Sequence, residues 1–369
     1  MLSLAVSWDL YVQTRSPIVL GNIGLVQVAP FLFFALAAGH LADHVDRRHI
    51  LLLTQILLIG SSAILSFGAK SVPLIYACLF LTATARAFQG PARQAMVAHV
   101  VPPGALSNAI TWNSSAFEIA NVSGPALAGL LLASTGSRTV YLVQLCLATV
   151  TLICFERLSI RLDNGREIPP GGKSLLEGVR FVRHSKLILP AMSLDMFAVL
   201  FGGATALLPI FAIEILHVGA RGFGWLRAAP SIGAVSMALL LAHTHPNRKT
   251  GRVLLWSVAG FGMATVVFGF SRSYWLSFAA LVLTGALDNI SVVLRQSLLQ
   301  MNTPDHLRGR VLAVNNIFIS CSNQLGAVES GWTAAWFGPV GSVVGGGLAT
   351  IAIVVAFAAK SPALRRWRL

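Results

Sequence analysis

Charged residues are scarce in this sequence. Asp, Glu, Lys and Arg make up 11% of the 369 residues, whereas soluble domains carry about a quarter. Too little charge is therefore available to cover a surface that faces water on all sides. Hydrophobic residues reach 55%, and the mean hydropathy is +0.74. These values exclude a cytosolic enzyme, a DNA-binding protein and a secreted disulfide scaffold, and they favour a chain that lies mostly in lipid.

The sequence also lacks the patterns that mark catalytic and metal sites. Its four cysteines lie inside apolar runs and form no C-x-x-C pair, so we interpret them as small buried hydrophobic residues. The histidines show no metal-ligand spacing. No G-x-x-x-x-G-K-[ST] loop is present to bind ATP, and neither a serine-hydrolase elbow nor H-E-x-x-H occurs. We expect no enzyme activity, no cofactor and no metal.

Long apolar runs, separated by short charged segments, make up most of the chain. A membrane-spanning helix needs about 20 predominantly apolar residues. The runs predict one partial and eleven full spanning helices, at residues 1–13, 18–42, 49–68, 72–92, 107–133, 138–156, 187–216, 221–243, 252–270, 274–299, 309–334 and 338–359.

The distribution of basic residues predicts the orientation of these helices. Twenty of the 27 Lys and Arg residues, Arg295 among them, fall at even-numbered connections or in the C-terminal tail, five fall at odd-numbered connections, and Arg86 and Arg227 fall within helices. Because Lys and Arg mark cytoplasmic loops, we expect a multi-pass protein of the inner (plasma) membrane with a cytoplasmic C-terminus. These positions account for the net charge of +14, so we expect no nucleic-acid partner.

The longest polar stretch, residues 156–186, divides the chain in two. We predict an N-terminal bundle at 1–157, a cytoplasmic linker at 158–186, a C-terminal bundle at 187–360 and a cytoplasmic tail at 361–369. Within the linker, Ser174 and Glu177 have capping-box spacing. Apolar and basic residues then alternate with helical periodicity, which predicts a short amphipathic helix on the inner membrane surface.

The two halves resemble each other at a nearly constant offset. Residues 24–30 (GLVQVAP) match residues 224–230 (GWLRAAP) at an offset of 200, and the pairs Arg93–Gln94 and Arg295–Gln296 match at 202. Parallel duplication of a six-helix unit occurs in secondary transporters. The offset also places the start of the first helix before Met1, so we expect that helix to be truncated, either by a misplaced start or in a shortened product.

The connection after the second predicted helix, residues 39–48, reads GHLADHVDRR. A carboxylate here could reach the N-terminus of the helix that opens near Arg308 and Arg310 and latch the cytoplasmic end; the alternative is a solvated, positive-inside turn. The segment resembles motif A of the major facilitator superfamily, with His44 in place of Arg and Asp46 in place of Gly. The acidic form occurs in its enterobactin-exporter-like branch. The resemblance assigns gating to Gly39, Asp43, Asp46, Arg47 and Arg48.

Two further segments carry the same resemblance. Residues 86–90 (RAFQG) resemble motif B of the fourth helix, which implies a role for Arg86 in proton coupling; simple snorkelling of Arg86 to the membrane surface is the alternative. Residues 120–129 (ANVSGPALAG) resemble motif C, the antiporter signature of exporters, through Gly124, Pro125 and Gly129. Glycine permits close helix contact and proline bends a helix, although ordinary small-residue packing would use the same residues.

Carboxylates inside predicted spans are candidate proton sites, because a carboxylate in lipid is costly. We rank Asp288, Glu118, Glu329 and Asp195 in that order, with pairing to Asn or Ser neighbours as the alternative. Asp288 lies 202 residues after Arg86, so we expect both side chains to face a central cavity. Asp9 and Glu214 lie near outer helix ends, where solvation is the simpler interpretation.

Together, these features predict an all-α membrane protein with the major facilitator fold, in which two pseudo-symmetric six-helix bundles comprise twelve transmembrane helices, the first truncated. The resemblance implies a proton-driven exporter of a small amphipathic molecule, such as a drug or siderophore, that works by alternating access. Its partners would be the small-molecule substrate, protons and the lipid bilayer, and we expect a monomer. The alternatives are an importer or uniporter of a small nutrient, or a truncated product that does not transport.

Overall fold

The computed structural model describes residues 1–68, 71–101, 105–157, 171–243 and 250–367. Within these ranges all regular secondary structure is helical. Ten described segments are long and apolar enough to cross a membrane, and the longest of them, residues 307–360, is interrupted near its middle. The predicted all-α membrane fold is confirmed.

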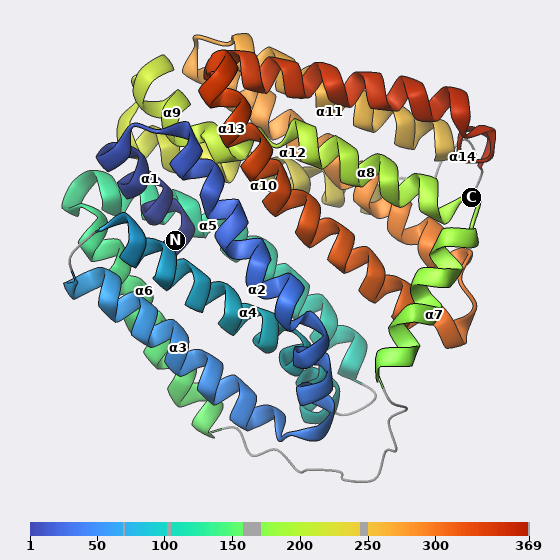
Figure 1. Cartoon of the computed structure of the whole chain (residues 1–369), viewed down its shortest axis with the longest axis horizontal. Coiled ribbons are helices and arrows are strands. Elements are labelled where there is room, and N and C mark those ends of the chain that lie inside the picture. Colours follow the sequence, from blue (N-terminus) through green and yellow to red (C-terminus); the bar gives the residue numbers. More distant parts are fainter. Residues whose placement is uncertain (69–70, 102–104, 158–170, 244–249, 368–369) are drawn as a thin grey trace.

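The first half of the chain forms six helices, coloured blue to green in Figure 1. They are α1 (Leu2–Thr14), α2 (Pro17–His44), α3 (Arg47–Phe67), α4 (Val72–Val100), α5 (Leu106–Thr135) and α6 (Ser137–Arg157). Tight turns connect α1 to α2 and α5 to α6. The turn residues Arg15 and Gly136 both have positive φ. α4 continues beyond the predicted end at residue 92 and includes the basic residue Arg93.

The second half repeats this pattern. Its long helices are α8 (Ile188–Gly202), α10 (Gly219–Ala242), α11 (Thr250–Phe270), α12 (Tyr274–Met301) and α13 (Asp305–Lys360). α13 contains a break at Gly338, whose φ of 75° no helix allows, and Pro339 follows. α13 is therefore two helices in sequence. A short helix, α14 (Pro362–Arg366), packs against α11.

The predicted helix at 187–216 is wrong in one respect, because the segment is broken. α8 ends at Gly202, and a 3-10 turn η2 (Ala204–Leu207), α9 (Leu208–Ile210) and a π-helical turn η3 (Phe211–Ile215) follow. Gly203 leaves the helical region with φ −74° and ψ 61°, and Pro209 has no backbone N–H to donate. Counting apolar residues could not reveal this break, since the run stays apolar throughout.

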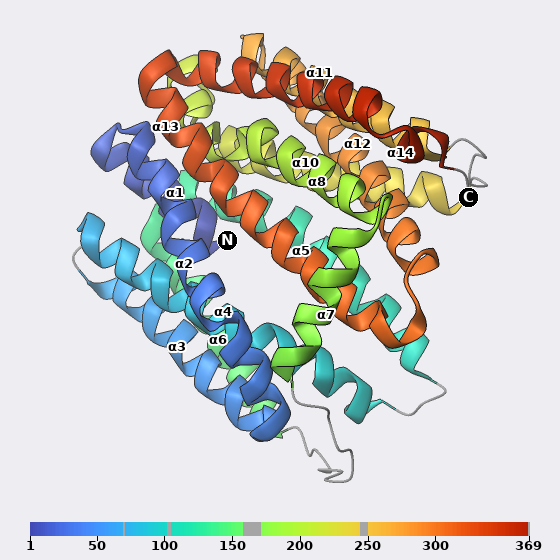
Figure 2. The ribbon, with the colours of Figure 1, turned by 45° about the vertical axis from the view of Figure 1, so that its right-hand side comes forward.

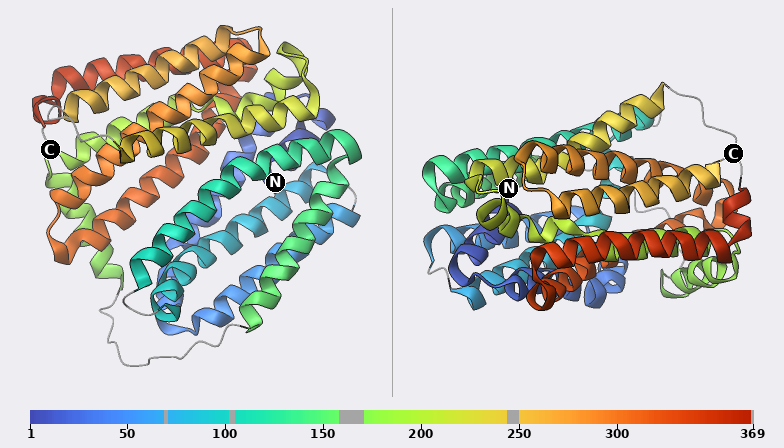
Figure 3. Two further views of the ribbon diagram at one scale, coloured as in Figure 1. Left: turned by 180° about the vertical axis from the view of Figure 1, so that it is seen from behind. Right: turned by 90° about the horizontal axis from the view of Figure 1, so that it is seen from above.

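The two groups of helices meet at one end and diverge at the other. Figures 1 and 3 show them close together where α1 and α9 lie and farther apart where α7 (Gly171–His184) and the C-terminus lie. α2 packs against α13, and α5 packs against α10, so each group contributes one helix to each of two contacts between the groups. We call the meeting end the closed end and the other the open end.

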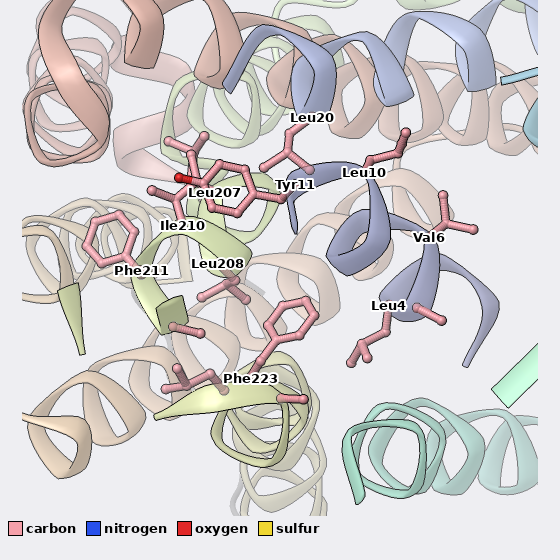
Figure 4. Packing of buried hydrophobic residues seen from close by; sticks show 14 of the residues in the cluster. Leu4, Val6, Leu10, Tyr11, Leu20, Leu207, Leu208, Ile210, Phe211 and Phe223 are labelled. Atoms are coloured by element: carbon pink, nitrogen blue, oxygen red, sulfur yellow. The ribbon is translucent and has the colours of Figure 1, made fainter. Parts of the chain in front are cut away.

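A hydrophobic cluster fills the closed end. Leu10 and Tyr11 of α1 lie in it together with Phe211 of η3 and Phe223 of α10, all buried (Figure 4). The rings of Phe211 and Phe268 lie 4.6 Å apart between centroids. The cluster draws on both halves of the chain, so it fastens the two groups together at this end.

α7 lies along the open end beside the first part of α13 (Figure 2). Glu177 of α7 forms an ion pair with Arg310 of α13, and a Cβ at Gly178 would lie 3.0 Å from the backbone of Arg310. Val182 is buried in a cluster with Ile188 of α8, whereas Val179 is exposed. The amphipathic helix predicted in the linker is therefore present and is packed on the second group.

Candidate transport cavity

A cavity of about 730 Å³ lies between the two groups of helices. From the first group, α1, α2, α4 and α5 line it; from the second, η2, α10 and α13 do. Its polar lining side chains come from both groups and include Gln27, Asn121, Asn323 and Gln324. The apolar part of the wall includes Phe31, Phe117 and Phe223.

Arg86 lines this cavity from α4. Its side chain is accessible to water although the residue lies inside a spanning segment. A guanidinium is tolerated at that depth when it faces a wet space. The structure thus places the motif B arginine in the central cavity and not at the membrane surface.

A second arginine, Arg227 of α10, lines the same cavity. Its Nη1 donates a hydrogen bond to the carbonyl oxygen of Thr205 at 3.1 Å, at the break after α8. Sequence reasoning gave Arg227 no role, yet the repeat contained the signal. At the offset of 200 its counterpart is Gln27, which also lines the cavity. Both guanidinium groups share the space with no Asp or Glu from the described lining residues.

Asp288 lies beside this cavity and not within it. It lines a smaller pocket of about 190 Å³, and Thr205 and Asn323 belong to the walls of both spaces. The expectation that Arg86 and Asp288 face one cavity therefore needs correction, because the break at Gly203 puts η2 between Asp288 and the main cavity.

Behind Asp288, Asp195 of α8 and Arg295 of α12 form a buried ion pair. The side chains are 8% and 2% exposed, respectively. Asp195, Asp288 and Ser291 line one further small pocket. Counting Arg295 with the cytoplasmic connections was wrong: it lies inside α12, about two turns from the helix end, and extends to the carboxylate of Asp195.

Motif C lies at a contact between the two groups. A Cβ on Gly129 of α5 would lie 2.6 Å from the Cα of Gly224 in α10, and a Cβ on Gly224 would lie 2.9 Å from the carbonyl oxygen of Pro125. Real Cβ atoms essentially never approach so closely. Gly124 has ordinary space around it. Gly129 is therefore the motif C glycine on which the α5–α10 contact depends.

A second glycine contact joins α2 and α13. A Cβ on Gly21 would lie 2.9 Å from the Cα of Gly331. Gly331 lies 202 residues after Gly129, the offset at which other landmarks repeat. Glycine contacts thus join the groups twice, and each contact takes one glycine from each copy of the repeat.

The sequence matches the transmembrane secretion effector family over residues 1–367. The chain belongs to this family of major facilitator transporters. Solved structures agree on the fold. A bacterial homolog of the human lysosomal transporter Spinster, inward-facing and unoccupied, matches with a TM-score of 0.73 at 15% identity, covering 99% of this chain and 93% of that one. A D-xylose–proton symporter matches with a TM-score of 0.75 at 14% identity, covering 100% and 96%.

Curated relatives of this major facilitator transporter include siderophore transporters. The staphyloferrin A transporter of Staphylococcus aureus is 23% identical over 322 residues, which is 84% of this chain and 80% of that protein. The enterobactin exporter EntS of Citrobacter koseri is 28% identical over 251 residues, 68% of this chain. That match spans only 60% of the enterobactin exporter's length.

The motif A segment of the transporter is described in part. Gly39 and Asp43 belong to α2, but their side chains lie outside the described residues. Asp46 caps α3 by accepting a hydrogen bond from the backbone N–H of Arg48 at 2.9 Å, and the Arg48 guanidinium donates to the carbonyl of Glu156. Arg47 opens α3.

The helix that motif A was expected to meet has other described partners in this state. Arg310 pairs with Glu177, and Arg308 pairs with Asp305 at 2.6 Å. The gating latch remains a prediction.

The remaining intramembrane carboxylates lie outside the cavity lining. Glu118 is next to the lining residue Phe117 on α5. Glu329 of α13 lies beside Ser330, whose hydroxyl donates to the carbonyl of Gly203 at 3.2 Å. Asp9, expected to be solvated, is instead buried and accepts a hydrogen bond from Tyr141 at 2.9 Å.

Proposed function

We propose that this transporter exports a small amphipathic molecule, such as a siderophore or a drug, in exchange for protons. The observation that carries the proposal is a cavity walled by both groups of helices, which a hydrophobic cluster joins at the closed end and which lie farther apart at the open end (Figure 1). Rocking of one group against the other would close the open end and part the glycine contacts, which is alternating access.

The proposed direction starts from the predicted orientation. Most basic residues lie at the even-numbered connections and in the C-terminal tail, as expected for cytoplasmic segments, so we assign α7 and the C-terminus to the cytoplasm. The open end then faces the cytoplasm, and the cavity can load there. Motif C and the names of the siderophore-transporting relatives support export. We assign the protein to the inner membrane, as a monomer.

Asp288 is our first candidate for the exchanged proton. Its pocket adjoins the cavity through Thr205 and Asn323, so its protonation can respond to what the cavity holds. Asp195 is already paired with Arg295 and ranks last; Glu118 and Glu329 stay between them. Arg86, in the cavity itself, would sense the same exchange through its charge.

Everted membrane vesicles test this proposal, with staphyloferrin A and enterobactin as the probes. Acidifying the vesicle lumen should drive accumulation of a probe, and a protonophore should abolish it. Asp288→Asn should lose gradient-driven accumulation but retain exchange of labelled for unlabelled probe. Asp305→Asn, which changes an exposed carboxylate at the start of α13, is the matched control and should behave as the parent.

Two results would contradict the proposal. Gradient-driven accumulation that survives in Asp288→Asn removes the proton role from that residue. Probe uptake into right-side-out vesicles, driven by external acid, identifies an importer.

A further inference from the structure

The cavity carries positive charge from two arginines, one in each half. Arg86 comes from α4 and Arg227 from α10, and both line the same space. Among the described lining residues there is no carboxylate to balance them. A guanidinium stays protonated under all physiological conditions. The described lining of the cavity is therefore cationic whatever the pH on either side of the membrane.

Most of the donors on these two arginines are unused. A guanidinium has five N–H donors. Arg227 commits one nitrogen to the carbonyl of Thr205 at 3.1 Å, and Arg86 forms no hydrogen bond or ion pair with any other described residue. Its side chain is accessible to the cavity. Both arginines can thus bond to a solute in the cavity, and an anionic oxygen is the partner that suits their planar fork best.

The rest of the lining limits the solute further. Four amides, Gln27, Asn121, Asn323 and Gln324, offer donors and acceptors around the arginines, and Phe31, Phe117 and Phe223 offer apolar surface. The volume of about 730 Å³ lies within the range of pockets that enclose drug-sized ligands, roughly 300–1,000 Å³.

We infer that the cavity binds a small organic anion with at least two acidic groups, one held by Arg86 and the other by Arg227. The inference rests on the proposed function and names the class of its substrate. Because the two arginines belong to different halves, one solute of this kind joins both halves across the cavity. A neutral or cationic molecule would leave both guanidinium groups without a charged partner.

Ligand binding to the purified full-length chain tests the inference without transport. Citrate is the probe, and its neutral triethyl ester is the matched ligand control. Citrate should raise the Tm of the parent protein by an amount that grows with the logarithm of its concentration above the Kd, and the ester should not. Arg86→Gln and Arg227→Gln should each weaken citrate binding about tenfold, as expected for loss of a charge-assisted hydrogen bond.

The chain supplies matched controls on the same helices. Arg93 on α4 and Arg221 on α10 are exposed and lie outside the cavity lining, so Arg93→Gln and Arg221→Gln should bind citrate as the parent does. Arg86→Lys and Arg227→Lys keep the charge and should recover part of the affinity. This recovery separates a binding role from a merely structural one if a glutamine variant folds poorly.

The possible results distinguish the anion site from the proposed proton exchange. Absence of a citrate shift in the parent, an equal shift in all variants, or a larger shift with the ester would overturn the inference. Citrate binding that depends on both arginines, combined with no proton-driven transport, would uphold the anion site and refute the exchange mechanism. Proton-driven export of a neutral probe that Arg227→Gln leaves intact would uphold the exchange and refute the anion site.

Discussion

Gly129 of α5 and Gly224 of α10 touch backbone to backbone across the two halves of the protein, so that a Cβ on Gly224 would lie 2.7 Å from the Cα of Gly129. Such a contact requires that both positions lack a side chain. It also ties motif C to a residue that the repeat relates to Gly24 of the first half. We predict that the antiporter-like signature forms half of a seal at the closed end.

We predict that Gly224→Ala weakens the closed end. The added methyl group meets the backbone of both Gly129 and Pro125, so α5 and α10 must separate, at a cost of about 1–3 kcal/mol for an overpacked contact. Spin labels at Thr135 and Arg221, both exposed, should report a longer and broader distance distribution. Gly60→Ala is the control, because nothing lies within 4 Å of its added Cβ. An unchanged distribution in Gly224→Ala would show that the contact is not a seal.

The buried pair of Asp195 and Arg295 leads to a stability prediction. Asp195→Asn leaves a buried guanidinium without its counter-charge and should lower stability by about 3–5 kcal/mol, measured by thermal unfolding in detergent. The double variant Asp195→Leu with Arg295→Met removes both charges and should recover most of that loss.

An exposed pair provides the comparison. Asp305 and Arg308 lie at the start of α13 with side chains 89% and 46% exposed, respectively, and Arg308→Met should change stability by less than about 1 kcal/mol. Equal losses in Asp195→Asn and Arg308→Met would contradict the assigned burial.

Asp46 has a structural explanation that is distinct from gating. It caps α3 by accepting the N–H of Arg48, and loss of such a cap costs about 0.5–2 kcal/mol. Asp46→Ala should therefore lower the Tm, while Asp46→Ser and Asp46→Asn, which also cap, should retain both stability and transport. If Asp46→Asn keeps the Tm but stops transport, the charge itself serves the gate.

The pair of Glu177 and Arg310 holds α7 against α13 at the open end. We predict that Glu177→Arg displaces α7 by charge repulsion and that the swap Glu177→Arg with Arg310→Glu restores its place. The yield of crosslinking between a cysteine on α7 and one on the first part of α13, which are in contact, should fall in the single variant and recover in the swap. The yield would stay constant through the series if apolar packing around Val182 alone positioned the helix.

Much of the architecture could be predicted from the sequence, because in a membrane protein the length of each apolar run and the position of the basic residues between runs are informative. The runs located the spanning helices, and the repeat related Gln27 to Arg227. The motif resemblances indicated Arg86 and Gly129, which the structure places in the cavity and at the contact between halves. In these cases a local pattern carried the information.

Other features depended on three-dimensional arrangement. The break at Gly203 lies in a run that remains apolar, so hydropathy did not reveal it. Arg295 was assigned to a loop because sequence position does not show that its side chain reaches Asp195, on another helix a hundred residues earlier. Arg227 was left without a role because the sequence does not show that it lines the same cavity as Arg86.

The interruption after Gly202 has a consequence for how this transporter can diversify. Arg227 is anchored to the main-chain oxygen of residue 205, not to its threonine side chain. Every amino acid has this main-chain oxygen. Substitutions at position 205 can therefore change the cavity wall and its selectivity, while the hydrogen bond that holds Arg227 is kept. Related transporters could therefore change their substrate at this position without changing the position of Arg227.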